Sequence, residues 1–275
     1  MQNTLDGSVG QSALPLVDAT TGNVVSGEVT TRGILLFVHG FMDAPESIAA
    51  VSQALDLSDW TMLAVDLRAL QQKAPGAGTA LQGFADATVA ALQSCGLTDG
   101  HDFVVIGHSM GGQVAELVAA RLGDALKGLV LICPAPLQGY PLTAEQQDMF
   151  RQRAMTRDPE AIKAGRGRLA PNASGDSMQT LVKTAMETEV DTALFQLDAW
   201  TTGDPAGREP SQVNLPVRLV CSDDIFFTPD FLSEHVTPRF SNIQTTHIAE
   251  AGHWPHVERP AQVANVVKTF TKRLT

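Results

Sequence analysis

The sequence predicts an α/β fold with a mostly parallel central sheet flanked by helices, and three observations support this. Short apolar runs recur along the chain, each bounded by turn residues. Segments with helical periodicity lie between these runs. The chain has 275 residues, of which 44% are hydrophobic, so it can bury a large core. Strands that alternate with helices form parallel sheets through right-handed crossovers.

Five apolar runs suit strands that are buried on both faces of the sheet. They are residues 33–38, 61–65, 103–106, 129–132 and 217–221, and a sixth run at 244–249 precedes the last helix. The intervening helices are expected at 47–55, 83–95, 112–122 and 261–274. Near the N-terminus, Thr20-Thr21-Gly22-Asn23 is typical of a turn between two weak antiparallel strands at the sheet edge.

The segment between the fourth and fifth strands lacks a clear strand-like run. Structureless connections of that length are rare in compact domains. Helical stretches lie at 178–189 and 192–201, and the middle of the segment is interrupted by Gly165, Gly167, Pro171, Asn172 and Gly175. We therefore expect residues 137–212 to form a helical cap or lid over the strand ends, inserted in a core made of residues 1–136 and 213–275.

Composition excludes several classes of partner. The net charge of −11 argues against a nucleic-acid partner and against an anionic membrane surface. The three cysteines, Cys95, Cys133 and Cys221, have no C-x-x-C spacing, so they indicate neither a disulfide framework nor a zinc site. The start of the chain does not resemble a signal peptide, and no apolar run approaches the roughly 20 residues of a membrane helix. We expect a cytoplasmic monomer or homodimer.

Gly107-His108-Ser109-Met110-Gly111-Gly112 follows an apolar run and opens a helical segment. This is the context that a G-x-S-x-G nucleophile elbow requires, and it disfavours a chance match in a loop. The small residues on either side of the serine let strand and helix approach closely. At the start of a helix, the serine also lies where developing negative charge is favoured. The sequence therefore predicts Ser109 as a nucleophile.

A serine hydroxyl needs a base within hydrogen-bonding reach. His253 follows the last strand-like run and precedes the last helix. A loop in that position lies at the carboxyl ends of the strands, on the same side as the elbow. His256 is the rival base, but Pro255 and the helical residues after it are expected to turn His256 away.

The acid that orients the base is expected between Ser109 and His253 in the chain. Ser222-Asp223-Asp224 follows the fifth strand. Successive side chains of a strand point to opposite sides, so only one of the two aspartates can face the histidine. We favour Asp224, and Asp223 stays the alternative.

The turn His39-Gly40-Phe41-Met42 follows the first strand. Its glycine permits a tight turn with amides aimed toward the elbow. We assign the oxyanion hole to the backbone N–H groups of Phe41 and Met110. His39 is expected to be a hydrogen-bonding residue under the loop.

Together these motifs resemble the α/β-hydrolase superfamily, in particular its esterase, lactonase and C–C hydrolase branch with a helical cap. The segment Gly252-His253-Trp254-Pro255-His256-Val257-Glu258-Arg259-Pro260 is similar to the family's G-H-x-x-H-x-E-x-P loop. The resemblance covers about residues 30–140 and 213–275. The chain departs from the family at 66–71, where the glycine-rich turn is absent, and before Asp224, where the usual glycine is missing.

The expected activity is hydrolysis of a carboxylic ester or lactone by water, through an acyl-enzyme and without a metal or organic cofactor. Serine at the elbow separates this chain from dehalogenases and epoxide hydrolases of the same fold, which use aspartate there. Two alternatives stay open. One is hydrolysis of a C–C bond in a ketone-containing acid, and the other is a non-catalytic receptor for a small molecule.

The substrate pocket is the least determined part of the site. Side chains expected to line it are Met42, Phe150, Phe195, Trp200 and Trp254. The helical spacing of the cap residues among them also fits packing against the core. Lys163, Arg166 and Arg168 form a basic group that suits either steering of an anionic substrate or a solvated loop, and we favour the loop.

Overall fold

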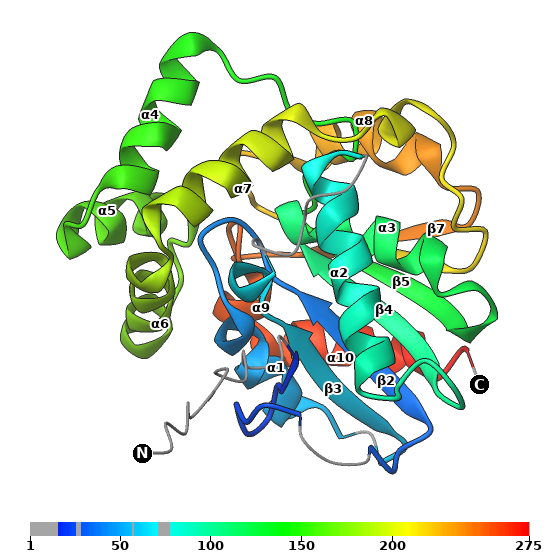
Figure 1. Ribbon diagram of the computed structural model, residues 1–275. Coiled ribbons are helices and arrows are strands. Elements are labelled where there is room, and N and C mark those ends of the chain that lie inside the picture. Colours follow the sequence, from blue (N-terminus) through cyan, green and yellow to red (C-terminus); the bar gives the residue numbers. More distant parts are fainter. Residues whose placement is uncertain (1–15, 26–28, 57, 71–77, 275) are drawn as a thin grey trace, which may run out of the picture.

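The computed structural model describes residues 16–25, 29–56, 58–70 and 78–274 (Figure 1). These residues form one sheet of seven strands in the order β1-β3-β2-β4-β5-β6-β7, and only β1 is antiparallel to its neighbour. The strands are β1 (Leu16–Asp18), β2 (Gly33–Val38), β3 (Trp60–Val65), β4 (Asp102–His108), β5 (Leu126–Ile132), β6 (Val217–Ser222) and β7 (Ile243–Ile248). The predicted mostly parallel α/β fold is confirmed.

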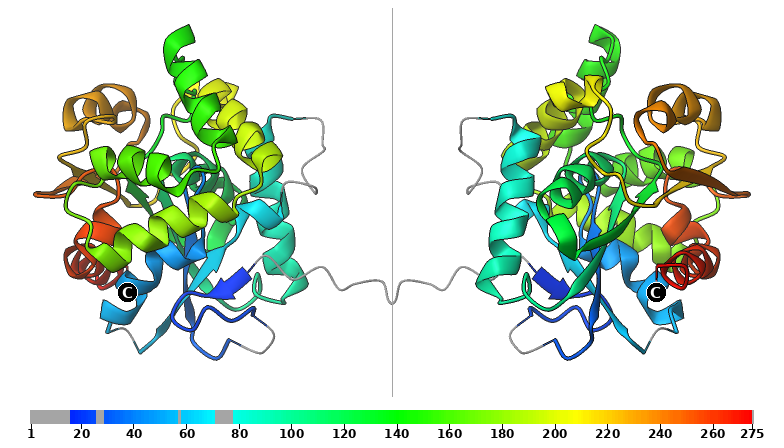
Figure 2. Two further views of the ribbon diagram at one scale, coloured as in Figure 1. Left: turned by 90° about the vertical axis from the view of Figure 1, so that its left-hand side faces the viewer. Right: turned by 90° about the vertical axis from the view of Figure 1, so that its right-hand side faces the viewer.

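Helices cover both faces of this sheet (Figures 1 and 2). Helices α2 (Ala80–Ser94) and α3 (Met110–Arg121) pack together on one face. Helices α1 (Ala49–Ala54) and α10 (Pro260–Thr271) pack together on the other, next to the short α9 (Pro255–Glu258). Helix α8 (Pro229–His235) follows β6. No helix among the described residues is both long and apolar enough to cross a membrane.

Successive side chains of β2 belong to two different hydrophobic cores, which explains why the central strands are continuous apolar runs in the sequence. Ile34, Leu36 and Val38 belong to the hydrophobic core that includes α2 and α3. Leu35 and Phe37, between them in the chain, belong to the core formed with α1 and α10. A strand that is covered on both faces needs apolar side chains at every position.

The N-terminal turn lies at the sheet edge, as expected. The amide of Asp18 donates to the carbonyl of Asn23 at 2.9 Å, and Val17 bridges Val24 in antiparallel fashion. Gly22 has a φ of 72°, which a residue with a side chain rarely adopts. The flanking strand β1 pairs antiparallel with β3.

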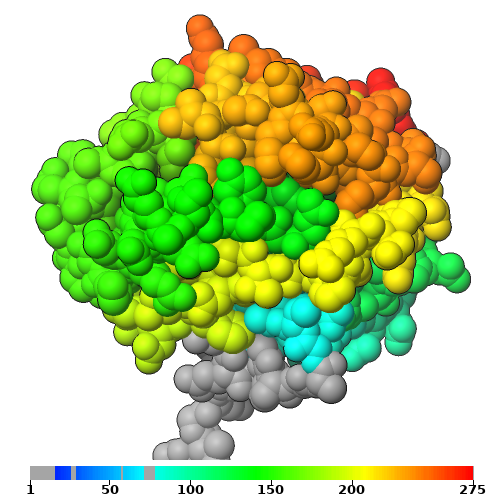
Figure 3. All heavy atoms as spheres, turned by 90° about the horizontal axis from the view of Figure 1, so that it is seen from above, coloured from blue at the N-terminus to red at the C-terminus, as the bar shows by residue number. Residues whose placement is uncertain are grey.

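Four helices connect β5 to β6 and lie together outside the two helical layers (Figure 1). They are α4 (Ala144–Met155), α5 (Pro159–Leu169), α6 (Gly175–Glu187) and α7 (Val190–Thr202). Viewed from above, this segment and the residues after β6 cover one end of the molecule (Figure 3).

The expected break at Gly165 and Gly167 is wrong, because α5 runs through both glycines. A glycine inside a helix costs about 1 kcal/mol relative to alanine, which a capped helix tolerates. Asp158 caps the start of α5 by accepting a hydrogen bond from the Glu160 amide. The chain breaks instead after Leu169, ahead of the Ser174 cap of α6.

Candidate active site

Ser109 lies at a sharp turn between β4 and α3. Its φ of 53° and ψ of −123° place it in a region that residues other than glycine rarely adopt. The turn is held from the neighbouring strand, because the Ser109 amide donates to the carbonyl of Ile132 at 3.0 Å. A Cβ atom at Gly111 would overlap the carbonyl oxygens of Val38 and His39, so only glycine lets the helix approach β2 this closely. The serine conformation is therefore strained and held in place by its surroundings.

The structure brings the three residues of the predicted triad together. Nε2 of His253 lies 2.9 Å from Oγ of Ser109. Nδ1 of the same ring lies 2.6 Å from Oδ2 of Asp224. All three side chains belong to buried residues, with 9%, 6% and 2% of the surface of Ser109, His253 and Asp224 exposed. A hydrogen-bonded path thus joins a carboxylate, an imidazole and a hydroxyl.

The loop that carries His253 is fixed from several sides. The amide of His253 donates to the carbonyl of Leu169, at the end of α5, over 2.6 Å. Oγ of Ser222, the last residue of β6, donates to the Gly252 carbonyl at 2.6 Å. Glu258 accepts from the Gly252 amide through one carboxylate oxygen and from the Asn172 amide through the other. The position of the imidazole therefore depends on both the sheet and the segment between β5 and β6.

The two aspartates after β6 have different environments. The buried Asp224 accepts from the Phe226 amide at 2.8 Å as well as contacting His253. Burial raises the pKa of Asp224, but the neighbouring His253 and the hydrogen bonds outweigh that effect and hold the pKa below its usual value. Asp223 is exposed, pairs with His247 at 2.9 Å and accepts from the Glu250 amide. Of these two aspartates, Asp224 is the one that contacts the imidazole of His253.

The turn after β2 runs beside the serine. A Cβ atom on Gly40 would lie 3.0 Å from the Cβ of Ser109, which leaves no free space between them. His39 lies under the turn, as expected, and its Nε2 accepts from the Leu67 amide at 3.0 Å. Met110 is the first residue of α3, so its amide has no acceptor within the helix. The Phe41 and Met110 amides thus belong to the two turns that flank the serine hydroxyl.

A pocket opens at Ser109 and is mostly apolar. Four of the five predicted lining residues, Met42, Phe150, Trp200 and Trp254, contribute to its wall. Phe195 does not line the pocket, which corrects the prediction. Its ring packs edge-to-face on Phe84 of α2, with 5.6 Å between the centroids, because this side of α7 covers α2.

Arg166 corrects the expectation of a solvated loop. It lies on α5, lines the pocket and is only 8% exposed. Its Nη2 donates to the carbonyl of Met42 at 2.6 Å, and its guanidinium carbon lies 4.5 Å from the Trp254 ring centroid. Burial lowers the pKa of Arg166 to about 10, so the side chain stays charged at neutral pH. Lys163 and Arg168 are exposed, as expected, but they too lie on α5 and not on a loop.

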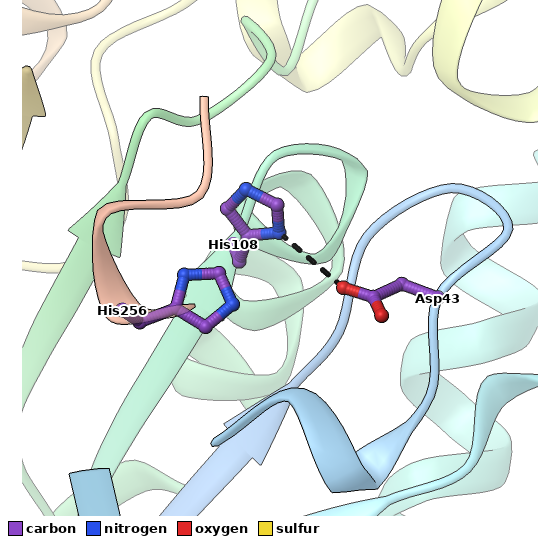
Figure 4. A group of neighbouring side chains, drawn as sticks. All are labelled: Asp43, His108 and His256. Carbon is purple, nitrogen blue, oxygen red and sulfur yellow. Dashed lines mark ion pairs between the residues drawn. The ribbon is translucent and has the colours of Figure 1, made fainter. Parts of the chain in front are cut away.

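Asp43, His108 and His256 form a buried cluster beside the triad (Figure 4). They offer one carboxylate oxygen and two imidazole nitrogens within 4.8 Å of one another, which are donor types that zinc binds. Burial lowers the pKa of His256 to about 4 and that of His108 well below its usual value. Both imidazoles are therefore neutral at pH 7, and the 3.9 Å contact between His108 and Asp43 is not an ion pair.

This cluster also supports the His253 loop. Nε2 of His108 lies 2.8 Å from the His253 carbonyl, and Trp254 donates its indole N–H to Asp43 at 3.3 Å. His256 does not contact Ser109, since it lies against the rings of His108 and Phe37. The rival base is thus a buried packing residue.

Sequence reasoning missed several residues of the site. Phe226 and Phe227 line the pocket, and their position two and three residues after Asp224 was a usable signal. Arg153 also lines the pocket, from α4, a helix that was not among the predicted ones. Its Thr143-x-x-Gln146 capping box was the signal for that helix.

Known proteins resemble this chain in sequence. A family model described as the alpha/beta hydrolase family matches residues 35–266. A putative esterase/lipase of Haemophilus influenzae is 23% identical over 247 residues, which cover 87% of this chain and 83% of that protein. An sn-1-specific diacylglycerol lipase of Mus musculus is 23% identical over 264 residues, which cover 90% of this chain and 83% of that protein.

Solved structures share the fold. An esterase from Exiguobacterium antarcticum has a TM-score of 0.76 at 16% identity, covering 94% of this chain and 98% of that one. A thermophilic esterase from Thermogutta terrifontis has a TM-score of 0.70 at 22% identity, covering 89% and 91%. At these identities the likeness concerns the fold alone.

Proposed function

The chain belongs to the alpha/beta hydrolase family, and on that premise we propose that it hydrolyses a carboxylic ester or lactone through Ser109, His253 and Asp224. One observation carries the proposal: a buried path of two hydrogen bonds, 2.6 and 2.9 Å long, joins Asp224 through His253 to the hydroxyl of Ser109. A serine with this partner gains the base that it otherwise lacks. The esterase and lipase names of the relatives favour the same reaction class.

In the first half of the reaction, Oγ of Ser109 attacks the carbonyl carbon of the substrate while Nε2 of His253 takes the hydroxyl proton. Asp224 holds the imidazole tautomer with Nδ1 protonated and stabilises the imidazolium. When the tetrahedral intermediate collapses, the imidazolium gives its proton to the leaving alkoxide, and the acyl group stays on the serine. In the second half, His253 takes a proton from a water molecule that attacks the acyl-enzyme, and it returns this proton to Oγ of Ser109 as the acid leaves.

The developing oxyanion is assigned to the backbone amides of Phe41 and Met110. The closeness of Gly40 to the Cβ of Ser109 supports this assignment, since it puts the turn after β2 directly beside the nucleophile. The Met110 amide also lies at the start of α3, where the helix dipole favours negative charge. Losing one such donor typically costs about 10²–10³ in kcat.

Residues 137–212 are proposed as the cap of the site. Helices α4, α5 and α7 supply the pocket residues Phe150, Ile162 and Trp200, which supports this role. We propose that the cap selects the substrate, while residues 1–136 and 213–275 carry the chemistry. A cytoplasmic location and a monomeric or homodimeric state stay predictions.

Turnover of 4-nitrophenyl acetate and butyrate tests the proposal, with Ser109→Ala as the matched variant. We expect turnover by the wild type, its loss by a factor of about 10³ or more in the variant, and labelling of Ser109 alone by a fluorophosphonate. Absence of both turnover and labelling contradicts the proposal. If a small molecule then raises the melting temperature without being consumed, the receptor alternative is favoured.

A further inference from the structure

Arg166 places a buried positive charge in the wall of an apolar pocket. The residue is 8% exposed and lies on α5, with Trp254 stacked against its guanidinium group at 4.5 Å. A charged group removed from water is costly unless it is paired. The charge of Arg166 therefore calls for a partner of opposite charge.

The protein itself satisfies Arg166 only in part. A guanidinium group has five N–H donors, and Nη2 donates to the carbonyl of Met42. Within the described residues, Arg166 forms no ion pair with a carboxylate. Asp43 attracts the cation from farther away, but its two oxygens already accept from the Ala44 amide and the Trp254 indole.

A second arginine lines the same pocket. Arg153 of α4 lies with its guanidinium carbon 5.4 Å from the centroid of the Phe150 ring, and its Nε would lie 3.7 Å from a Cβ atom at Gly165 of α5. The described lining thus holds two arginines and neither an aspartate nor a glutamate. This lining contrasts with the net charge of −11 of the whole chain.

We propose that the pocket binds a substrate with a free carboxylate, which pairs with Arg166 while the carbonyl to be attacked lies at Ser109. The planar fork of a guanidinium group matches a carboxylate, and stacking on Trp254 holds its plane. Arg153 adds a second, less buried cation at the same pocket. The inference rests on the proposed function and specifies its substrate class as anionic esters or lactones.

A matched pair of substrates tests the proposal. Mono-4-nitrophenyl glutarate and 4-nitrophenyl valerate have acyl chains of similar length, and only the first carries a carboxylate. We expect the wild type to favour the glutarate ester in kcat/KM. In Arg166→Gln the ratio of the two kcat/KM values should fall by about 10- to 100-fold, the range for hydrogen bonds to a charged group. Arg168→Gln, an exposed change on the same helix, should leave this ratio within twofold of wild type.

A general loss of activity in Arg166→Gln would lower kcat/KM for both esters equally, so it would leave their ratio unchanged. Arg166→Lys keeps the charge without the fork and should give an intermediate ratio. A wild type without preference for the anionic ester, or a ratio that Arg166→Gln leaves unchanged, overturns the proposal.

Binding separates failure of this inference from failure of the proposed hydrolysis. Calorimetric titration of Ser109→Ala with monomethyl glutarate reports the carboxylate site without turnover. Adding Arg166→Gln should weaken binding at least tenfold, with the melting temperature recorded to check folding. Equal binding by the two variants, or binding by neither, overturns the inference. If esters are not turned over but this difference is found, only the hydrolytic proposal fails.

Discussion

The backbone amide of Met42 donates a 3.1 Å hydrogen bond to Oε1 of Gln196, which ties the turn beside Ser109 to helix α7. Met42 has a φ of 52°, so the turn is strained and depends on such support. We expect Gln196→Leu to lower kcat by about tenfold, because a small displacement of the turn after β2 would misplace the Phe41 amide that is proposed to bind the oxyanion. Steady-state kinetics with 4-nitrophenyl butyrate measure this effect.

Gln147→Leu, an exposed change on α4, is the control for Gln196→Leu. The melting temperatures of both variants show whether each one is folded. An unchanged kcat in folded Gln196→Leu would show that the hydrogen bond does not position the turn.

The acid of the triad is tested by two matched variants. Asp224→Asn should lower kcat by about 10³–10⁴, because an amide does not hold the imidazole in the tautomer that accepts the serine proton. Asp223→Asn should leave kcat within a few-fold of wild type, since Asp223 faces His247 and solvent. A large loss in Asp223→Asn alone would reverse the assignment.

Buried apolar strands and the serine turn could be predicted from local sequence because their demands are local. A strand covered on both faces needs an unbroken apolar run, and 33–38 satisfies this at every position. The turn at Ser109 needs small neighbours, and Gly111 is one whose substitution would cause overlap. The place of His253 and of the acid followed from chain order, because parallel strands end at a common edge, although that order left Asp223 open beside Asp224.

The pocket could not be predicted in the same way, because it depends on how cap helices face the core. Phe195 and Trp200 lie on the same helix, yet one packs on Phe84 and the other lines the pocket. Their spacing does not tell which neighbour covers which side. Arg166 and Arg168 are likewise two residues apart, and only the first points into the protein.

Glu258 joins the His253 loop to Asn172 of the proposed cap, so its loss should destabilise the protein. Its carboxylate accepts from the amides of Gly252 and Asn172 at 2.8 and 2.9 Å. Glu258→Ala should lower the free energy of unfolding by about 1–3 kcal/mol, because the buried Gly252 amide loses its acceptor. Glu234→Ala, an exposed change on α8, should alter the free energy of unfolding by less than about 0.5 kcal/mol. Equal urea midpoints for the two variants would contradict this.

Because two histidines are buried, we expect the free energy of unfolding to fall on mild acidification. Burial lowers the pKa of His256 from 6.5 to about 4, so between these values the unfolded chain binds a proton that the folded protein does not. His256 therefore favours folding fully above pH 6.5, and this contribution is lost as the pH falls toward 4. At pH 5.5 the loss is about 1 kcal/mol for His256, and His108 adds a loss of the same sign.

Urea unfolding of the wild type at pH 7.5 and 5.5, compared with His256→Leu, measures the difference. The free energy of unfolding should fall less in the variant, and an equal fall in both proteins would show that His256 is not held neutral in the folded state.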